Sequence, residues 1–480
     1  MTAKLGLSVG AVWVALVILM AGPSGCTVSR SSPDGIDSGV VPATGDGDGS
    51  TPATTDESGG AADGSEPSAD GGADTSDSGA SDTDAGTDTT SDGTADNNGT
   101  QSGTLTAGSF DDNLNLEVFQ DFLTEVLQSD AAGDYPNLPL GQRIIVTVKD
   151  EQGVPVMDAR VVITPEGEED TTLLDQTTGS DGRVLFLTGL DNAADATSFA
   201  LTIHPPADAA PVSEVRDLDN LEWNVTLATA GTPPGNLDLA FVVDTTGSMA
   251  DELEYLKTEV SSIARAVDEL FPDVPQRYAL IAYRDQGDIY VVRTFDFTTS
   301  LDEFADNLTA QSADAGGDWP EAVHLALEAA GELSWADSDT ARVMFWIADA
   351  PPHTEFAERA FDAIQALRAK TIAVYPVAAS GVGTELEFYM RSAAFLTLSE
   401  YLFLTDDSGV GNPHAEPHIP CYLVQRLDQL MIRMIQAELT GARVEPDAAD
   451  IIRTVGNPVA GVCTPVQDDS GQQQGGQTQQ

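Results

Sequence analysis

Apolar runs and amphipathic stretches alternate along the second half of the chain. The first run, Leu237–Val243, is almost continuously apolar, as expected of a central parallel strand buried on both faces. A long amphipathic stretch follows from Met249 to Leu270. Over residues 236–440 this alternation predicts an α/β domain with a doubly wound, mostly parallel sheet. Further strands are expected at residues 277–284, 290–297, 343–347, 371–377 and 401–404, and helices at 301–308, 356–367, 384–394 and 424–439, with one more ending at residue 330.

The preceding region has a shorter period. Residues 140–230 contain runs that alternate with period two between turn residues, which predicts a smaller all-β, antiparallel sandwich domain. The expected strands are residues 143–148, 159–163, 171–176, 184–187, 198–203 and 222–227. Residues 107–135 are predicted to be helical, because Leu116, Phe119, Leu123 and Val126 recur on one helical face that would pack on a neighbouring domain.

Composition predicts disorder at both ends of the chain. Residues 27–106 consist mainly of Asp, Gly, Ser, Thr and Ala, so they form a long disordered acidic linker, and residues 467–480 form a Gln/Gly-rich disordered tail after a C-terminal extension, 441–466. The chain has 78 Asp and Glu against 21 Lys and Arg, a formal net charge of -57. This charge argues against binding nucleic acid or anionic lipid through a basic patch. Adaptation to high salt explains the same charge without any specific site.

The N-terminus has the pattern of an export signal. Lys4 precedes a short apolar run, residues 11–21, and small residues lead to Cys26, so residues 1–26 are expected to be a signal peptide. The end of this segment resembles a bacterial lipobox, which implies acylation of Cys26 and a lipid anchor, although Pro23 stands where an aliphatic residue is usual. The expected location is the cell envelope, as an outer-membrane lipoprotein, or the exterior after ordinary secretion. The other two cysteines, Cys421 and Cys463, are expected to form a disulfide.

Oxygen-bearing side chains follow the ends of predicted strands in the α/β domain. Asp244, Thr246 and Ser248 follow the first strand, Asp349 follows the strand at 343–347, and Asp318 lies in the loop before a helix. In open α/β sheets, ligands bind beyond the carboxyl ends of the strands. Hard oxygen donors suit Mg²⁺ or Ca²⁺, with Mn²⁺ as a further possibility. Each residue also has a plain structural alternative as a helix cap or turn residue.

These three loops, in this order, resemble the metal-ion-dependent adhesion site of von Willebrand factor type A domains. The resemblance implies a cation held by Asp244, Thr246, Ser248, Asp318 and Asp349. Asp318 stands where the family usually has Thr, which makes the site more anionic and weakens the capture of an acidic ligand. The β-rich region is similar to the carboxypeptidase regulatory-like modules of exported bacterial proteins.

The expected function is a non-enzymatic adhesion or scaffold module that binds a protein or another extracellular ligand through the metal face. Two alternatives remain: a metal-dependent hydrolase that uses His353 or His414, and a structural domain with a non-functional metal site. Asp407, Asn412 and His414 are further candidates for contacting a partner or a second ion, whereas zinc binding by His414, His418 and Asp406 is disfavoured.

Overall fold

The computed structural model describes residues 103–464 except 130, 208, 317–318, 410–413 and 415–416, and leaves the side chain of Asp251 undescribed. All of these residues belong to one compact unit, Asp92–Gln480. The predicted signal peptide with Cys26, almost all of the linker, Asp318, Asn412 and the tail at 467–480 lie outside the described residues. No helix in the described part of the chain is both long enough and apolar enough to cross a membrane.

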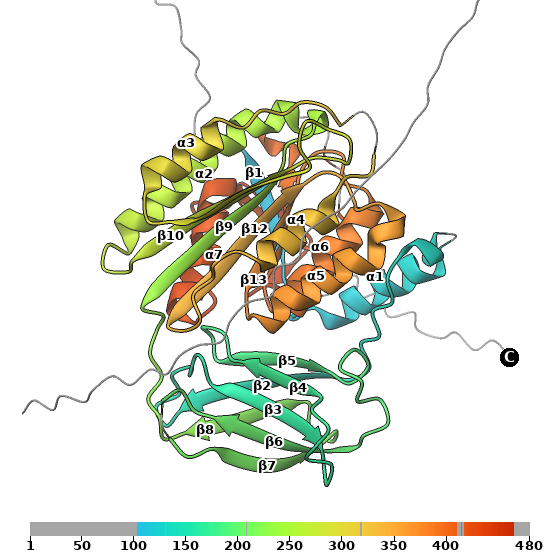
Figure 1. The fold of residues 1–480 in the computed structure, drawn as a ribbon, viewed down its shortest axis with the longest axis vertical. Helices are drawn as coiled ribbons and strands as arrows, with labels where there is room; N and C mark the ends of the chain where they lie inside the picture. The colour runs from blue at the N-terminus through green and yellow to red at the C-terminus, as the bar shows by residue number, and fades with distance from the viewer. Residues whose placement is uncertain are drawn as a thin grey trace, which may run out of the picture. The chain divides into compact units, whose positions relative to one another are not determined.

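A mixed sheet of nine strands forms the centre of the α/β domain (Figure 1). Its strand order is β11-β10-β9-β12-β13-β14-β1-β15-β16, and the five strands from β10 to β14 in this order are parallel. The predicted fold class, a doubly wound and mostly parallel sheet, is therefore confirmed. The strands are β1 (Thr106–Phe110), β9 (Asn236–Asp244), β10 (Gln276–Tyr283), β11 (Val292–Thr298), β12 (Thr340–Ala348), β13 (Ala373–Ala378), β14 (Tyr401–Thr405), β15 (Tyr422–Arg426) and β16 (Arg453–Val455).

Helices cover both faces of this sheet (Figure 1). One apolar core joins alternate residues of β9, such as Phe241, to α2, α3 and α7, and a second core joins the intervening residues, such as Val242, to α1, α4, α5 and α6. This alternation is the reason that a central strand reads as a continuous apolar run. The helices are α1 (Leu116–Gln128), α2 (Ala250–Leu270), α3 (Leu301–Thr309), α4 (Val323–Gly331), α5 (Ala357–Ala369), α6 (Thr384–Leu396) and α7 (Leu427–Thr440), with short 3₁₀ turns η1 (Ala132–Asp134), η2 (Gly247–Met249), η3 (Thr354–Phe356) and η4 (Asp406–Ser408).

The domain boundaries differ from the prediction at both ends. Residues Thr106–Phe110 were assigned to the linker and a helical segment, but they form β1, which lies antiparallel between β14 and β15. The helix is shorter, Leu116–Gln128, and residues 424–426 belong to a strand rather than to the last helix. The sheet therefore recruits segments on both sides of residues 236–440. The sequence Thr-Ala-Gly-Ser-Phe carries little strand signal, and Gly108 is required there because a Cβ would lie 2.6 Å from the Phe403 ring.

The β-rich region is a sandwich of a three-stranded sheet, β5-β2-β8, and a four-stranded sheet, β4-β3-β6-β7. Phe186, Phe199 and Trp223 fill its core. One pair departs from the antiparallel expectation, because β2 and β8 are parallel. The prediction also missed β7, an edge strand whose residues are all at least partly exposed. The strands are β2 (Arg143–Asp150), β3 (Arg160–Pro165), β4 (Leu174–Thr177), β5 (Arg183–Leu187), β6 (Ser198–His204), β7 (Val212–Asp217) and β8 (Glu222–Leu227).

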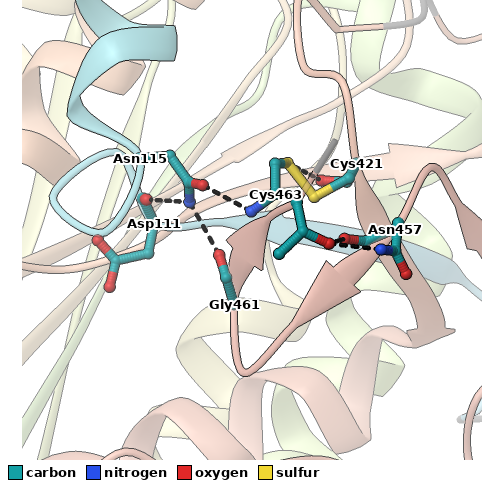
Figure 2. The surroundings of a disulfide bond; sticks show 7 residues. Asp111, Asn115, Cys421, Asn457, Gly461 and Cys463 are labelled. Carbon is teal, nitrogen blue, oxygen red and sulfur yellow. Dashed lines mark hydrogen bonds between the residues drawn. A yellow bond between two sulfur atoms is a disulfide. The ribbon is translucent and has the colours of Figure 1, made fainter. Parts of the chain in front are cut away.

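A disulfide joins Cys421, next to β15, to Cys463 in the C-terminal extension, with a Cα–Cα distance of 5.6 Å (Figure 2). The extension forms the small hairpin β17 (Pro458–Val459) and β18 (Val462–Cys463). Asn115, just before α1, accepts a hydrogen bond from the Cys463 N–H and donates one to the Gly461 carbonyl, both at 2.8 Å. The extension is thus fastened to the start of α1 as well as to β15.

Candidate functional site

Three loops at the carboxyl edge of the sheet are hydrogen-bonded to one another. The Gly247 N–H in the loop after β9 donates to the Ala315 carbonyl at 3.0 Å, and the Glu321 N–H donates to the Pro351 carbonyl in the loop after β12, also at 3.0 Å. Because β9, β10 and β12 are parallel neighbours, their carboxyl ends lie at one edge. These contacts show that the chain brings the predicted loops together over a separation of about a hundred residues.

The first loop holds Asp244, Thr246 and Ser248. Asp244, the last residue of β9, and Thr246 are fully buried, whereas Ser248 is exposed. The Oδ1 atom of Asp244 accepts from the Thr246 N–H at 2.9 Å and from the Thr246 hydroxyl at 2.7 Å. The Thr246 and Ser248 hydroxyl oxygens are 3.1 Å apart. The other carboxylate oxygen, Oδ2 of Asp244, is buried and has no well-formed hydrogen bond among the described residues, although the Tyr283 hydroxyl is near enough to lower the pKa of this carboxyl.

Two further carboxyls lie at this position. Asp349 follows β12 directly and is buried. Glu321 is 2% exposed, and its Oε2 atom has no hydrogen-bond partner among the residues that the structure describes. Gly316 shows how close the second loop approaches the first, because a Cβ at this residue, with φ +62°, would lie 2.6 Å from the Thr246 Cβ and 3.1 Å from Glu321 Oε1. Glu321 is therefore beside Thr246, although the sequence analysis did not select it as a ligand.

The electrostatics of the loops reflect this crowding of buried carboxyls. Burial, followed by the negative charge of Asp349, raises the pKa of Asp244 to about 7. Burial raises the pKa of Glu321 to about 9, with further contributions from Asp244, Asp285 and Asp349. Both carboxyls therefore take up protons far more readily than ordinary carboxyls when no metal is bound. A group that binds a proton this tightly in a buried site is also a strong candidate to bind another cation.

The capping alternative explains only part of this geometry. Asp244, Ser248 and Asp349 are not the N-cap residues of the helices that follow these loops. The N-caps of η2, α2, η3 and α5 are other residues, and none of them forms a side-chain capping hydrogen bond. Asp244 does stabilise a local turn through Oδ1, but its Oδ2 atom takes no part in that turn.

The donor set of carboxylate and hydroxyl oxygens fits Mg²⁺ or Ca²⁺, and the orphaned Asp244 and Glu321 oxygens are where such an ion would be bound. Within the described residues no group of three or more His, Cys, Asp or Glu side chains is arranged as a metal site, so a cation would depend on the hydroxyls as well.

The histidines between β14 and β15 have separate partners. The Nδ1 atom of His414 lies 2.8 Å from Asp406 Oδ1, and its Nε2 atom lies 3.1 Å from Glu252 Oε1 and 3.2 Å from Ser380 Oγ. His418 instead contacts Glu387 at 2.7 Å. The Ser380–His414–Asp406 order resembles a hydrolytic triad, but the Glu252 carboxylate binds both the Ser380 hydroxyl and its backbone N–H. The cluster therefore fastens α2 to the loops after β13 and β14.

Two other predicted residues, His353 and Asp407, form contacts with different parts of the sheet edge. His353 is close to the loops, where its Nε2 atom lies 2.6 Å from Asp285 Oδ1 at the end of β10. Asp407 forms an ion pair with Arg453 of β16 at 2.8 Å. Glu321 follows Pro320 in the second loop, where the sequence analysis selected Asp318 rather than Glu321 as the ligand.

Comparison with known proteins gives the domain its family. A family profile for the von Willebrand factor A domain matches residues 238–409. The chain is 32% identical over 159 residues to an ariadne-like RING finger protein of Acanthamoeba polyphaga mimivirus, a match that covers 29% of this chain and 16% of that protein. It is 33% identical over 123 residues to the alpha-protein kinase vwkA of Dictyostelium discoideum, covering 25% of this chain and 19% of the kinase. The chain thus spans less than a fifth of the length of these relatives.

The chain also matches solved structures at low sequence identity. The conserved hypothetical protein BatB of Bacteroides thetaiotaomicron is 19% identical, with a TM-score of 0.24, over 30% of this chain and 67% of that chain. A von Willebrand factor type A protein of Catenulispora acidiphila is 15% identical, with a TM-score of 0.27, over 42% of this chain and 40% of that one. Proximal thread matrix protein 1 of the mussel byssus is 14% identical, with a TM-score of 0.26, over 35% of this chain and 47% of that one.

The profile match spans β9 to β14 and includes the first loop, the described part of the second loop, and the third loop. The parallel order of these strands and the helices on both faces agree with it. Residues 238–409 of this chain therefore form a von Willebrand factor A domain.

Proposed function

We propose that this von Willebrand factor A domain holds Mg²⁺ or Ca²⁺, or Mn²⁺ in their place, and binds a protein or another extracellular ligand through that ion, without catalysing a reaction. Domains of this family commonly mediate protein binding, and the cation dependence is the part specific to this proposal. It is supported above all by the orphaned oxygens of Asp244 and Glu321, two buried carboxyls in hydrogen-bonded loops. Asp244, Thr246, Ser248 and Asp349 would hold the ion, with Glu321 as a further ligand.

The physical reason is the cost of burying charge. A carboxylate that is removed from water without a cationic partner destabilises the folded state by several kcal/mol, and a protein avoids this cost by protonation or by binding a cation. The described residues give Asp244 and Glu321 no salt bridge. A divalent ion with hard oxygen ligands would offset this charge and, when bound, would leave a coordination position for an oxygen of the partner. The predicted ligand Asp318 lies next to Trp319 in the same loop, but outside the described residues.

We also propose that the protein is exported and held at the cell envelope by a lipid on Cys26, or else secreted. The export signal in the sequence supports this part, and the disulfide between Cys421 and Cys463 agrees with an oxidising compartment. Labelling with a palmitate analogue tests the lipid anchor directly. Label on wild type that is lost in Cys26→Ala is expected, and unlabelled wild-type protein would contradict the anchor.

The cation site is tested by calorimetric titration of Mg²⁺, Ca²⁺ and Mn²⁺ into the full-length protein. Asp244→Ala and Asp349→Ala are expected to abolish the binding isotherm. Glu321→Gln is expected to weaken binding about tenfold or more, because the loss of even an outer carboxylate contact commonly lowers metal affinity by this order. Asp302→Ala, an exposed carboxylate at the start of α3, is the matched control and should bind as wild type does. Wild-type binding by both Asp244→Ala and Asp349→Ala would show that the site is misassigned.

A further inference from the structure

The metal face carries more negative charge than one divalent ion neutralises. Asp244, Glu321 and Asp349 are buried there, and Asp285 and Asp288 lie in the adjoining turn after β10. The turn is linked to the same loops, because Asp285 Oδ1 lies 2.6 Å from His353 Nε2 in the loop after β12, and the Asp285 N–H donates to Asp288 Oδ2 at 3.2 Å. When all three buried carboxyls are ionised around it, an ion of charge two leaves one net negative charge on them, before Asp285 and Asp288 are considered.

Three basic side chains near this face have contacts of their own. Arg284 donates to the Ser312 carbonyl at 2.6 Å, and its guanidinium lies 4.6 Å from the centre of the Tyr290 ring. Arg293 lies 3.7 Å from the centre of the same ring. Neither guanidinium forms a salt bridge with a described residue. His353 lies against Asp285. These side chains thus do not reverse the sign of the face.

Two exposed apolar side chains flank the carboxyls. Trp319 is 51% exposed and lies two residues before Glu321, and its ring reaches within 3.2 Å of a Cβ placed on Gly383, just before α6. Ile289 is 82% exposed in the turn after β10. The residue after it, Tyr290, is fixed to the first loop by a 2.7 Å hydrogen bond between its hydroxyl and that of Thr245. Large apolar side chains that remain exposed on either side of a charged site are typical of binding surfaces.

We infer that the partner of this face is a basic segment of a protein, whose Arg or Lys side chains lie against Trp319 and the carboxylates of Asp285 and Asp288. This inference rests on the proposed cation site and names the chemistry of its partner. A cation that already has several protein carboxylates attracts a further carboxylate only weakly, and a neutral carbonyl oxygen of the partner suffices to complete its coordination.

Charge complementarity and the aromatic ring act together in this arrangement. A guanidinium over an exposed Trp ring is attracted by the ring face, and a negative surface speeds the encounter with a basic segment. An acidic segment would instead meet like charge, which is a strong penalty in an interface. The face is therefore expected to select against acidic ligands.

The test compares three fluorescent peptides of equal length that differ only in carrying arginine, glutamine or glutamate at the same positions. Their binding to the full-length protein is followed by anisotropy in Mg²⁺, in Ca²⁺ and in EDTA, at about physiological salt, where non-specific attraction is screened beyond about 8 Å. The arginine peptide is expected to bind about tenfold tighter than the glutamine peptide in either cation, which corresponds to about 1.4 kcal/mol. The glutamate peptide is expected to show no binding.

Variants separate this face from the general acidity of the chain. Trp319→Ala should weaken the arginine peptide about tenfold, and Asp288→Asn about threefold. Val215→Ala, an exposed apolar residue on β7, and Asp302→Asn, an exposed carboxylate on α3, are the matched controls and should bind as wild type does. Equal losses in variants and controls, or none in the variants, would place the peptide elsewhere and overturn the inference.

Tighter binding of the glutamate peptide in Mg²⁺ would also overturn it, while leaving the cation site in place. Calorimetric titration of the cation into wild-type protein reports on the proposed function by itself. Absence of cation binding would therefore count against the proposed function, whereas cation binding with a preference for acidic peptides counts only against the basic partner.

Discussion

Asp112 and Glu387 are as deeply buried as Asp244 and Glu321, but they share the guanidinium of Arg391. The two Asp112 carboxylate oxygens lie 2.6 and 3.0 Å from Arg391 nitrogens, and Glu387 Oε1 lies 3.2 Å from a third. The Arg391 side chain is fully buried and lies 4.1 Å from the centre of the Phe122 ring, which brings α1 onto α6.

The three loops at the carboxyl edge of the sheet have the same kind of acidic side chain, but among the described residues no arginine or lysine forms an ion pair with Asp244 or Glu321. The presence or absence of an arginine partner therefore separates a buried carboxylate that packs two elements together from one that is a candidate for binding an ion. Where an arginine supplies the hydrogen bonds, the carboxylate is part of the packing of two elements, and removing it costs stability. Where an orphaned oxygen remains, as in Asp244 and Glu321, the fold keeps a group that destabilises it unless the group is protonated or binds a cation. Burial alone does not distinguish the two cases.

The largest effect is expected from removing the Arg391 guanidinium, the positive charge that Asp112 and Glu387 share. Arg391→Met leaves Asp112 and Glu387 buried without their partner, so we expect the free energy of unfolding to fall by about 3–5 kcal/mol. Urea denaturation in EDTA measures this change. Arg359→Met, which breaks the exposed pair with Glu328, is the control and should cost at most about 1 kcal/mol. A small effect of Arg391→Met would mean that the buried pair contributes little.

The next largest effect is expected from the reverse experiment, in which Mg²⁺ or Ca²⁺ is added to the protein to bind at Asp244 and Glu321. A ligand that binds only the folded state raises the free energy of unfolding by about 2.7 kcal/mol at a hundred times its dissociation constant. We therefore expect Mg²⁺ or Ca²⁺ to raise the melting temperature of the wild-type protein, and Asp244→Asn to abolish this shift. An unchanged melting temperature after chelation would favour a domain that packs without an ion.

The smallest expected effect for a single experimental step is the change of metal-free stability over one pH unit. The pKa of Asp244 is about 7 and that of Glu321 about 9 in the folded state, above the ordinary values of about 4 in an unfolded chain. The folded state therefore binds more protons. In EDTA the free energy of unfolding should fall as pH rises from about 5 to 9, by up to about 1.4 kcal/mol per pH unit for each carboxyl that is protonated only in the folded state.

Glu321→Gln should flatten the upper part of this profile, and urea denaturation at a series of pH values checks it. Glu400 gives the opposite sign, because Arg443 and Arg433 outweigh the effect of burial and lower the pKa of this carboxyl. Its contribution is present above its unfolded pKa and is lost as pH falls below about 4. A profile that rises between pH 5 and 9 would contradict the assignment of unpaired carboxyls to the loops.

Local patterns predicted most of the α/β domain but missed the segments that depend on distant partners. β9 and β12 were predicted within one to three residues at each end, because a buried parallel strand is apolar at nearly every position. β1 was missed, since its partners β14 and β15 lie about 300 residues away and supply the pairing that its own sequence does not indicate. β7 was missed because an edge strand with no fully buried residue lacks the apolar alternation that marks a strand.

The sequence by itself determined that Asp244, Thr246 and Ser248 follow a buried strand and that Asp349 follows another, because strand and loop follow directly from the apolar run and its end. Only the tertiary structure decided that Glu321 lies beside Thr246 and that its Oε2 atom has no hydrogen-bond partner among the described residues. It also decided that Arg391 reaches Asp112 across 279 positions, whereas no arginine in the described part of the chain pairs with Asp244. The physical reason is that the ionisation of a buried carboxylate depends on which charges lie within a few ångströms, and the order of residues along the chain does not fix those distances.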